Sequence, residues 1–234
     1  MFNRAQEYSG SWNFAPSGAE IIISAFQRIQ VRPTDILTSH IQQATMELNL
    51  LQAKLAGAQP NLWSVDLQAL PLVQGTATYS LPAETVMVTD AYIRTGTGTS
   101  TTDRMIFPIS RTEYAAITNK ATQATPNQFW FDRLISPTIT FYQTPDGNGP
   151  YVCYYYRVRL LQDALITNGF NIEVPTLWLD ALVAGLAHRL ARVYAPQLEQ
   201  IRKADADEAW LLAAGQDVEN VSLMIVPGTS GYFR

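Results

Sequence analysis

The sequence has few of the residues that usually carry chemistry, with one cysteine and two histidines among 234 residues. The lone Cys153 excludes an internal disulfide and a thiolate-rich metal cage, which fits a reducing compartment. There is no run of ~20 apolar residues that would suggest a membrane span. The first sixteen residues also lack the apolar stretch of a signal peptide. We therefore expect a protein made and assembled in the cytosol, with no membrane partner.

An excess of positive charge is also missing. Sixteen Lys and Arg residues face twenty Asp and Glu residues, for a formal net charge of -4. Tight binding of DNA or RNA depends on clustered Lys and Arg, so it is not expected. The sequence contains no glycine-rich phosphate loop, no HExxH and no CxxC. Nucleotide and zinc chemistry are therefore disfavoured, and we expect no metal and no cofactor.

Two helices are predicted near the N-terminus. Ser17-Gly18-Ala19-Glu20 has the spacing of a capping box, and the apolar run that follows it predicts a helix starting there. Arg32-Pro33-Thr34-Asp35 interrupts this helix and starts a second one, which Gly57 and Pro60 end. The second helix has one narrow apolar stripe, formed by Leu37, Ile41, Ala44, Leu48, Leu51 and Leu55.

Helical periodicity returns after Val174. Pro175 suits the start of a third helix. Pro196 restarts the chain into a fourth, from Gln197 to about Ala214, with Gly215 as its stop. The predicted apolar faces are Leu179, Leu182, Leu186, Leu190 and Val193 in the third helix, and Leu198, Ile201, Ala209 and Leu212 in the fourth.

Between these helices the sequence is rich in β-branched and aromatic residues. The polar run Thr95 to Thr102 predicts a hairpin tip or a mobile loop. The turn Thr144 to Pro150 predicts a hairpin between the last two strands. Ser110-Arg111-Thr112-Glu113 repeats the capping-box spacing and predicts a short helix to about Asn119. The predicted strands are Thr76 to Leu81, Thr85 to Arg94, Gln128 to Phe131, Thr138 to Gln143 and Tyr151 to Leu160.

This element order predicts an α+β fold. Residues 17–62 and 174–215 are expected to pair into one helical bundle, because both ends of the chain carry amphipathic helices. Residues 63–173 form an inserted β-rich domain with one short helix. Residues 216–234 form an extended C-terminal arm.

The two histidines are the first candidates for catalysis. His40 and His188 both lie beside an apolar stripe, and no Ser or Cys has the context of a nucleophile elbow. We interpret them as helix-packing or interface residues.

An acidic cluster in the fourth helix is the second candidate. Asp205, Asp207 and Glu208 could hydrolyse glycosides if a suitable gap separated two of them, but neighbours on one helix rarely have that geometry. Arg202 and Lys203 stand beside them, which favours a solvated face with local ion pairs. The same segment could line a channel.

Aromatic residues are dense in the predicted strands, in Phe129 to Phe131, Phe141 to Tyr142 and Tyr151 to Tyr156. Filling a thin sheet core explains most of them, although outward rings could form a sugar-binding or protein-binding face.

The C-terminal segment is apolar and follows a finished bundle. It could tuck back on its own domain, or it could insert into a partner as an added strand or in a groove. Its candidate anchors are Val221, Leu223, Ile225, Val226, Tyr232, Phe233 and Arg234.

Taken in order, these segments resemble the head-to-tail adaptor proteins of tailed bacteriophages, also called head-completion or packaged-DNA stabilisation proteins. The resemblance spans roughly residues 33–215 and is carried by TYSLP, PISRTEYAAI, TPNQFWF, ITFYQTPDGNGPYVCYYYRV and VPTLWLDALVAGLAHRLA. It implies a ring, commonly of twelve copies, in the neck of the virion between portal and tail. Double-stranded DNA passes through such a ring without sequence-specific binding.

The resemblance also implies roles for particular residues. The arm Val221 to Arg234 would reach into the portal, and the helical part would lie against it. The β-rich part would contact a tail or nozzle component, with Thr97, Thr99 and Asp103 at that surface. An acidic bore would let DNA slide, and Arg202, Asp205, Asp207 and Glu208 are candidates for its lining or for a subunit interface.

Three hypotheses follow. The leading one is a non-enzymatic adaptor ring, assembled in the host cytoplasm and carried in the virion. The second is a junction protein with peptidoglycan hydrolase activity at the acidic cluster, and the third is a carbohydrate-binding module that uses outward tyrosines.

Overall fold

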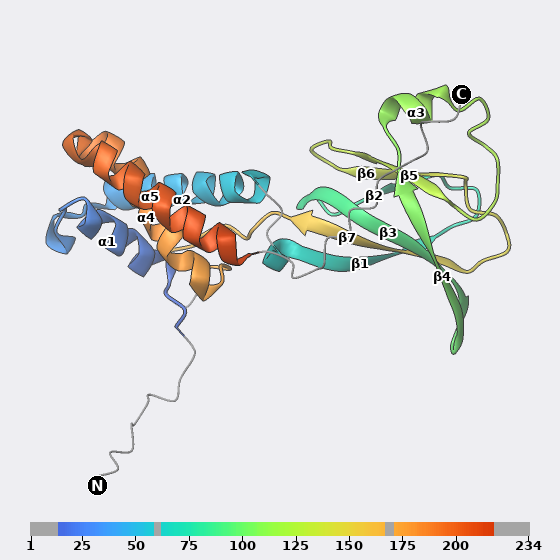
Figure 1. Ribbon diagram of the computed structural model, residues 1–234, viewed down its shortest axis with the longest axis horizontal. Coiled ribbons are helices and arrows are strands. Elements are labelled where there is room, and N and C mark those ends of the chain that lie inside the picture. Colours follow the sequence, from blue (N-terminus) through green and yellow to red (C-terminus); the bar gives the residue numbers. More distant parts are fainter. Residues whose placement is uncertain (1–13, 59–61, 167–170, 218–234) are drawn as a thin grey trace, which may run out of the picture.

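The computed structural model describes residues 14–58, 62–166 and 171–217. The molecule is elongated, with helices at one end and a curled sheet at the other (Figure 1). Helices from both ends of the chain pack together, and the strands lie between them in the sequence. The predicted α+β class is confirmed.

Four long helices build the helical end. The first begins with the predicted capping box, in which the Ser17 hydroxyl accepts from the Glu20 backbone N–H and the Glu20 carboxylate accepts from the Ser17 N–H at 2.8 Å. The helices are α1 (Gly18–Arg28), α2 (Thr38–Ala58), α4 (Leu179–Tyr194) and α5 (Glu199–Gln216).

The predicted start of the second helix is wrong by several residues. Pro33–Asp35 form a separate 3-10 turn, and Ile36 is extended, so α2 begins only at Thr38. Leu37 is therefore outside the apolar stripe and is 61% exposed. Its backbone N–H donates to the Nδ1 atom of His40 at 3.3 Å, which satisfies one amide at the start of the helix.

The bundle core lies where α1, α2 and α4 meet. The expected faces of α2 and α4 are buried there, apart from Leu37, the half-buried Ile41 and the exposed Val193. The core includes Ile21, Ile22, Phe26, Ala44, Leu48, Leu51, Leu55, Leu182, Leu186 and Leu190.

The predicted apolar face of the fourth helix is right at two positions, since Ala209 is buried and Leu198, just before α5, packs against the bundle core. It is wrong at Ile201 and Leu212, which are exposed, and the helix buries Ala213 in their place. Trp210 packs edge-on against Trp178, with ring centroids 5.1 Å apart. Alanines let α5 approach α4 closely, so the large apolar residues of α5 remain on the outside. Gly215, predicted as the stop, lies inside the helix.

The sheet has seven strands in the order β1-β7-β3-β4-β5-β6-β2. All neighbours are antiparallel except β4 and β5, which pair in parallel through two residue pairs. Two of the strands, β1 and β4, were not predicted. The strands are β1 (Val65–Leu72), β2 (Thr78–Ser80), β3 (Thr85–Thr97), β4 (Ser100–Pro108), β5 (Gln128–Asp132), β6 (Thr138–Tyr142) and β7 (Tyr151–Arg159).

The predicted hairpin between the last two strands is also wrong. Both edges of β6 are occupied, by β5 and β2, so β7 pairs instead with β1 and β3. The connecting turn is held by Asp146, which accepts from the Asn148 N–H at 2.9 Å and from the Tyr151 hydroxyl at 2.7 Å. The turn therefore carries the chain from one half of the sheet to the other.

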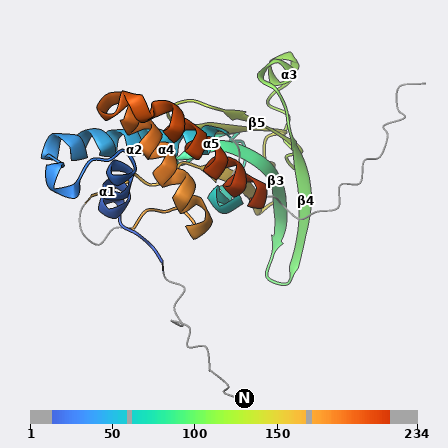
Figure 2. The same ribbon diagram turned by 60° about the vertical axis from the view of Figure 1, so that its left-hand side comes forward.

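The polar run after Arg94 is a hairpin tip, which was one of the two structures predicted for it; the other was a mobile loop. Strands β3 and β4 continue into it and pair as far as Thr97 with Ser100. The hairpin projects beyond the rest of the sheet (Figure 2). The short helix α3 (Arg111–Ala116) follows β4 and begins with the predicted capping box at Ser110 and Glu113.

The concave side of the sheet has its own core, which shares no residue with the bundle core. It is filled by alternate residues of the strands, as expected for a sheet with one buried face. It contains Leu81, Val88, Ala91, Ile93, Ile106, Phe129, Ile139, Phe141, Tyr151, Cys153 and Tyr155.

Candidate interaction surfaces

A cluster of charged residues lies at the end of the sheet nearest the helices. The Arg157 side chain is only 6% exposed and donates to Asp66 at 2.8 Å, to Glu84 at 3.1 Å and to the Thr85 hydroxyl at 3.0 Å. Hydrogen bonds from Arg157 hold the pKa of the Asp66 carboxyl below its usual value. This cluster fixes the bases of strands β1, β3 and β7 to one another.

Arg159 extends the cluster toward the helical end. It forms a two-point contact with Glu173, a residue just before α4. The hydrogen bonds from Arg159 lower the pKa of the Glu173 carboxyl. The contact ties the end of β7 to the segment that leads back into the bundle.

The convex face of the sheet carries an aromatic and cationic stack. The rings of Tyr92 and Tyr154, on the adjacent strands β3 and β7, lie parallel with centroids 5.3 Å apart. The Arg94 guanidinium lies 4.7 Å from the Tyr154 centroid and donates twice to Asp103, at 2.7 Å each. Hydrogen bonding from Arg94 lowers the pKa of the Asp103 carboxyl. Asp103 is therefore held within the sheet rather than presented at the tip.

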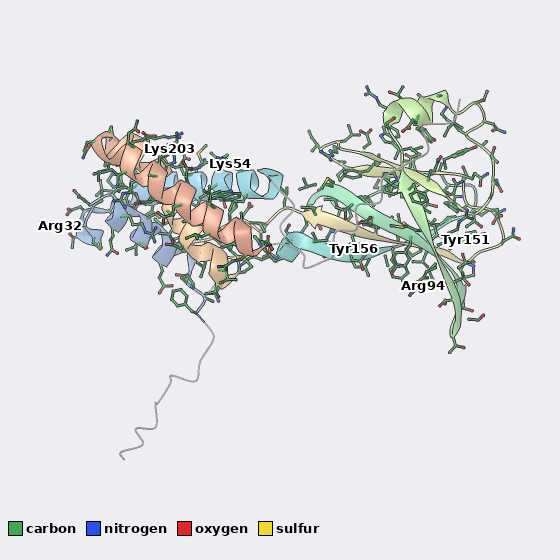
Figure 3. All side chains as sticks on the ribbon, viewed as in Figure 1. Arg32, Lys54, Arg94, Tyr151, Tyr156 and Lys203 are labelled. Atoms are coloured by element: carbon green, nitrogen blue, oxygen red, sulfur yellow. The ribbon has the colours of Figure 1, made fainter. Side chains whose placement is uncertain are left out.

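Apolar side chains surround this stack and remain open to solvent. Met105 and Phe107 of β4 point to the same face, and Leu67 and Tyr156 form a cross-strand pair beside them. All four are exposed. Figure 3 shows Arg94 and Tyr156 on this part of the sheet. The expectation that some aromatics point outward fits this face, which the alternation of β7 could have located in advance.

Two further surfaces lie at the outer edges of the sheet end. Thr97 and Thr99 are exposed at the hairpin tip, on either side of Gly98. Leu134 and Ile135 occupy the turn between β5 and β6, where Ile135 is 97% exposed. An apolar side chain so fully open has no role in this chain's own core, and it was not predicted as a site residue.

The predicted acidic cluster of α5 divides between two surroundings. Arg202 donates to Asp205 at 2.8 Å, three residues further along the helix. Asp207 faces a cleft between helices, and Glu208 is exposed. The local ion pair agrees with the interpretation as a solvated face.

That cleft is a hollow of the helical end with a volume of about 620 Å³. Its floor is made by Leu51 and Leu55 of α2 and by Trp210 of α5. Its rim carries four cationic side chains and two carboxylates. These are Lys54, Arg189, Arg192, Lys203, Glu47 and Asp207. The cleft has no local signature in the sequence, because it joins α2 to α4 and α5, which lie far from α2 in the chain.

Both histidines take part in helix packing. His40 contacts the ring of Tyr194 at 4.9 Å between centroids and that of Phe26 at 6.0 Å. His188 lies 3.0 Å from Glu199 and thereby links α4 to the start of α5. Hydrogen bonding from His188 lowers the pKa of Glu199.

Cys153 lies in the sheet core, where burial raises the pKa of its thiol to about 12. A thiol in this state is unreactive.

The described part of the chain offers no set of three or more His, Cys, Asp or Glu side chains placed to hold a metal ion. Among the helices of residues 14–58, 62–166 and 171–217, none combines the length and apolar character needed to span a membrane. The predicted portal-binding residues 221–234 lie outside the described residues.

Both the helical end and the sheet end of this elongated α+β protein carry exposed surfaces that its own cores do not use (Figure 1). The family model of the SU10 adaptor protein matches residues 17–223, so the chain belongs to this family of phage adaptor proteins. No curated protein matches the sequence. The resemblance stated from the sequence is thereby confirmed at the level of the family.

Proposed function

We propose that this protein forms a ring in the neck of a tailed phage virion, where it connects the portal to the tail and forms part of the DNA channel. The observation that carries the proposal is the match to a phage adaptor family over residues 17–223. Twelve copies are proposed for the ring, from the same resemblance. The ring would assemble in the host cytoplasm.

The shape of the subunit supports a connecting role. The helical end and the sheet end lie at opposite ends of the long axis (Figure 1), so each can contact a different partner. The projecting β3–β4 hairpin offers Thr97 and Thr99 to a tail component. Exposed Met105, Phe107 and Tyr156 provide apolar area that a neighbouring subunit or a tail component would cover.

The proposed portal contact is the arm from Val221 to Arg234, together with the helical end. Its apolar anchors suit a groove or a strand edge on the portal. Asp207 and Glu208 are proposed for the channel wall or a subunit contact, because both are exposed carboxylates on α5. Like charge would keep DNA from adhering to the wall.

Mass measurement on the protein alone and mixed with portal rings tests this proposal. We expect a defined multiple of the subunit mass bound to each portal ring. A chain truncated after Asn220 should keep its fold by circular dichroism and lose portal binding in sedimentation. Unimpaired binding of the truncated chain would remove the proposed role of the arm. Failure of the full chain to bind any portal or tail component would remove the connector function.

Zymography of the purified protein on peptidoglycan distinguishes the hydrolase hypothesis. We expect no clearing. Clearing that Asp207→Asn abolishes would assign a catalytic role to the α5 carboxylates instead.

A further inference from the structure

The cleft between α2, α4 and α5 has the two properties of a site for a peptide that is both apolar and acidic. Leu51 and Leu55 are buried at its floor and Trp210 is partly buried beside them. Above this floor Lys54 and Lys203 are exposed, and neither forms a salt bridge within the described residues. Figure 3 shows both lysines on the same side of the helical end.

Other charges around the cleft are already paired. Arg189 donates to Glu47 at 3.0 Å, and Arg192 lies 3.8 Å from Glu199, which also contacts His188. Asp207 is the carboxylate left on the rim. The unpaired positive charge of the rim therefore comes from two lysines, which favours an occupant that carries negative charge.

A passing DNA duplex would match the lysines but not the floor. Phosphate contacts need cationic side chains and gain nothing from buried Leu and Trp. An apolar floor beneath a charged rim is the arrangement that binds an apolar peptide with a charged neighbour.

The sequence that follows α5 has this composition. Residues 218–226 read VENVSLMIV, with Glu219 as the single charge and apolar side chains at Val221, Leu223 and Ile225. The next cation in the sequence is Arg234. The alternation of apolar residues would set one side of an extended segment on the cleft floor.

The lengths also fit. Trp210 marks one end of the cleft and lies seven residues before Asp217, which is about 10 Å along the helix axis. About three or four extended residues cover that distance on the return path. Val221 to Val226 would then reach about 20 Å further, past Lys203, which lies about 10 Å from Trp210 along α5.

We propose that the α2–α4–α5 cleft binds residues Val221–Val226 of the same chain in the free subunit, with the lysine rim attracting the negative charge of Glu219 just before them. This places the arm against its own bundle before any partner is met, and it does not depend on which partner later binds the arm.

Hydrogen exchange on the full chain tests the proposal. In the wild-type chain, the amides of residues 221–226 and of the cleft walls should exchange at least about tenfold more slowly than in the Lys54→Glu/Lys203→Glu variant. The walls should lose the same protection in a chain ending at Asp217. Arg32→Glu is the matched control, since Arg32 is exposed on the same bundle away from the cleft (Figure 3), and it should leave exchange unchanged.

Disulfide trapping tests whether the segment in the cleft belongs to the same chain or to a second copy. In a Cys153→Ser background, Lys54→Cys with Leu223→Cys should give a cross-linked monomer on a non-reducing gel at any protein concentration. Cross-linked dimers only, or equal exchange in all variants, would overturn the proposal. Portal binding is measured separately on the same variants. Its loss or survival tests the proposed connector function and does not test the binding of the arm in the cleft.

Discussion

The Arg157 guanidinium and the Asp66 carboxylate face each other across β7 and β1 with two hydrogen bonds, Nε to Oδ1 at 2.8 Å and Nη2 to Oδ2 at 3.2 Å. Glu84 and the Thr85 hydroxyl accept from the remaining nitrogen. A planar guanidinium suits this arrangement because its donors have a fixed fork geometry. Three strands are therefore joined by a single side chain at the end of the sheet next to the bundle.

We predict that Arg157→Met lowers the free energy of unfolding by roughly 2–4 kcal/mol, because it removes the buried cation that both Asp66 and Glu84 contact. Urea denaturation followed by circular dichroism measures the change. Arg94→Met removes an exposed pair with Asp103 and should cost clearly less. Equal losses in the two variants would contradict the importance of burial.

We predict that the free energy of unfolding decreases as the pH is lowered below about 4.5, the ordinary pKa of Glu173, and decreases further below about 3.8, the ordinary pKa of Asp66. Both pKa values are lower in the folded protein, so the unfolded chain binds protons first as the pH falls. The stabilisation is complete above the ordinary values and is lost as the pH falls through the folded ones. Urea titrations at a series of pH values should show a smaller decrease for Glu173→Gln.

Gly185 and Gly215 should respond in opposite ways to larger side chains. A Cβ atom at Gly185 would lie 3.0 Å from Leu51 Cδ2, where α2 and α4 cross, so Gly185→Leu should destabilise by about 1–3 kcal/mol. Nothing lies within 4 Å of the same position at Gly215. Gly215→Ala should therefore stabilise by about 0.5 kcal/mol through helix propensity. Thermal unfolding of both variants checks the signs.

Cys153 should not react with a thiol reagent such as DTNB at pH 8 until the protein unfolds. With the pKa raised to about 12, only about one thiol in 10⁴ is ionised at that pH. A Thr99→Cys variant provides an exposed thiol at the hairpin tip and should react at once with a stoichiometry of one. Rapid reaction of the native wild-type protein would mean that the sheet core opens readily.

Lysine at both Thr97 and Thr99 should leave the thermal midpoint within about 2 °C of wild type, because both positions are exposed. Portal binding should persist while attachment of the tail component is lost. In vitro joining of tails to filled heads measures the second effect. Gly96→Val is the contrasting change. Gly96 has φ +98°, and a Cβ there would lie 2.2 Å from the Ser100 carbonyl oxygen, so this variant should also disturb the hairpin itself.

Local signals in the sequence predicted the elements that depend on neighbouring residues. Both capping boxes formed at the expected serines, Ser17 and Ser110. Strand β1 was missed, since Pro71 interrupts its pattern. Pro71 is tolerated because β1 is an edge strand in the described sheet. The pairing of β6 and β7 was mispredicted because strand order depends on competition between distant strands, which no single turn reveals.

The candidate surfaces were harder to predict from the sequence than the helices and strands. Thr97 and Thr99 could be placed at a tip because glycines flank them. The Tyr92–Tyr154 stack and the α2–α4–α5 cleft each join segments at least sixty residues apart, so they depend on the complete fold. The face of α5 was mispredicted at Ile201 and Leu212 because small side chains pack against α4. Ala213 is buried, and Leu212 is left 63% exposed.

The bundle and the sheet bury separate sets of side chains, Leu48 and Leu186 in one and Phe129 and Phe141 in the other. A substitution that disturbs packing in one set leaves the contacts of the other intact, because distant sites without shared partners act additively. The two ends can therefore accumulate changes at different rates. During evolution, the surface residues of the sheet can therefore be replaced while the sequences of the helices stay the same.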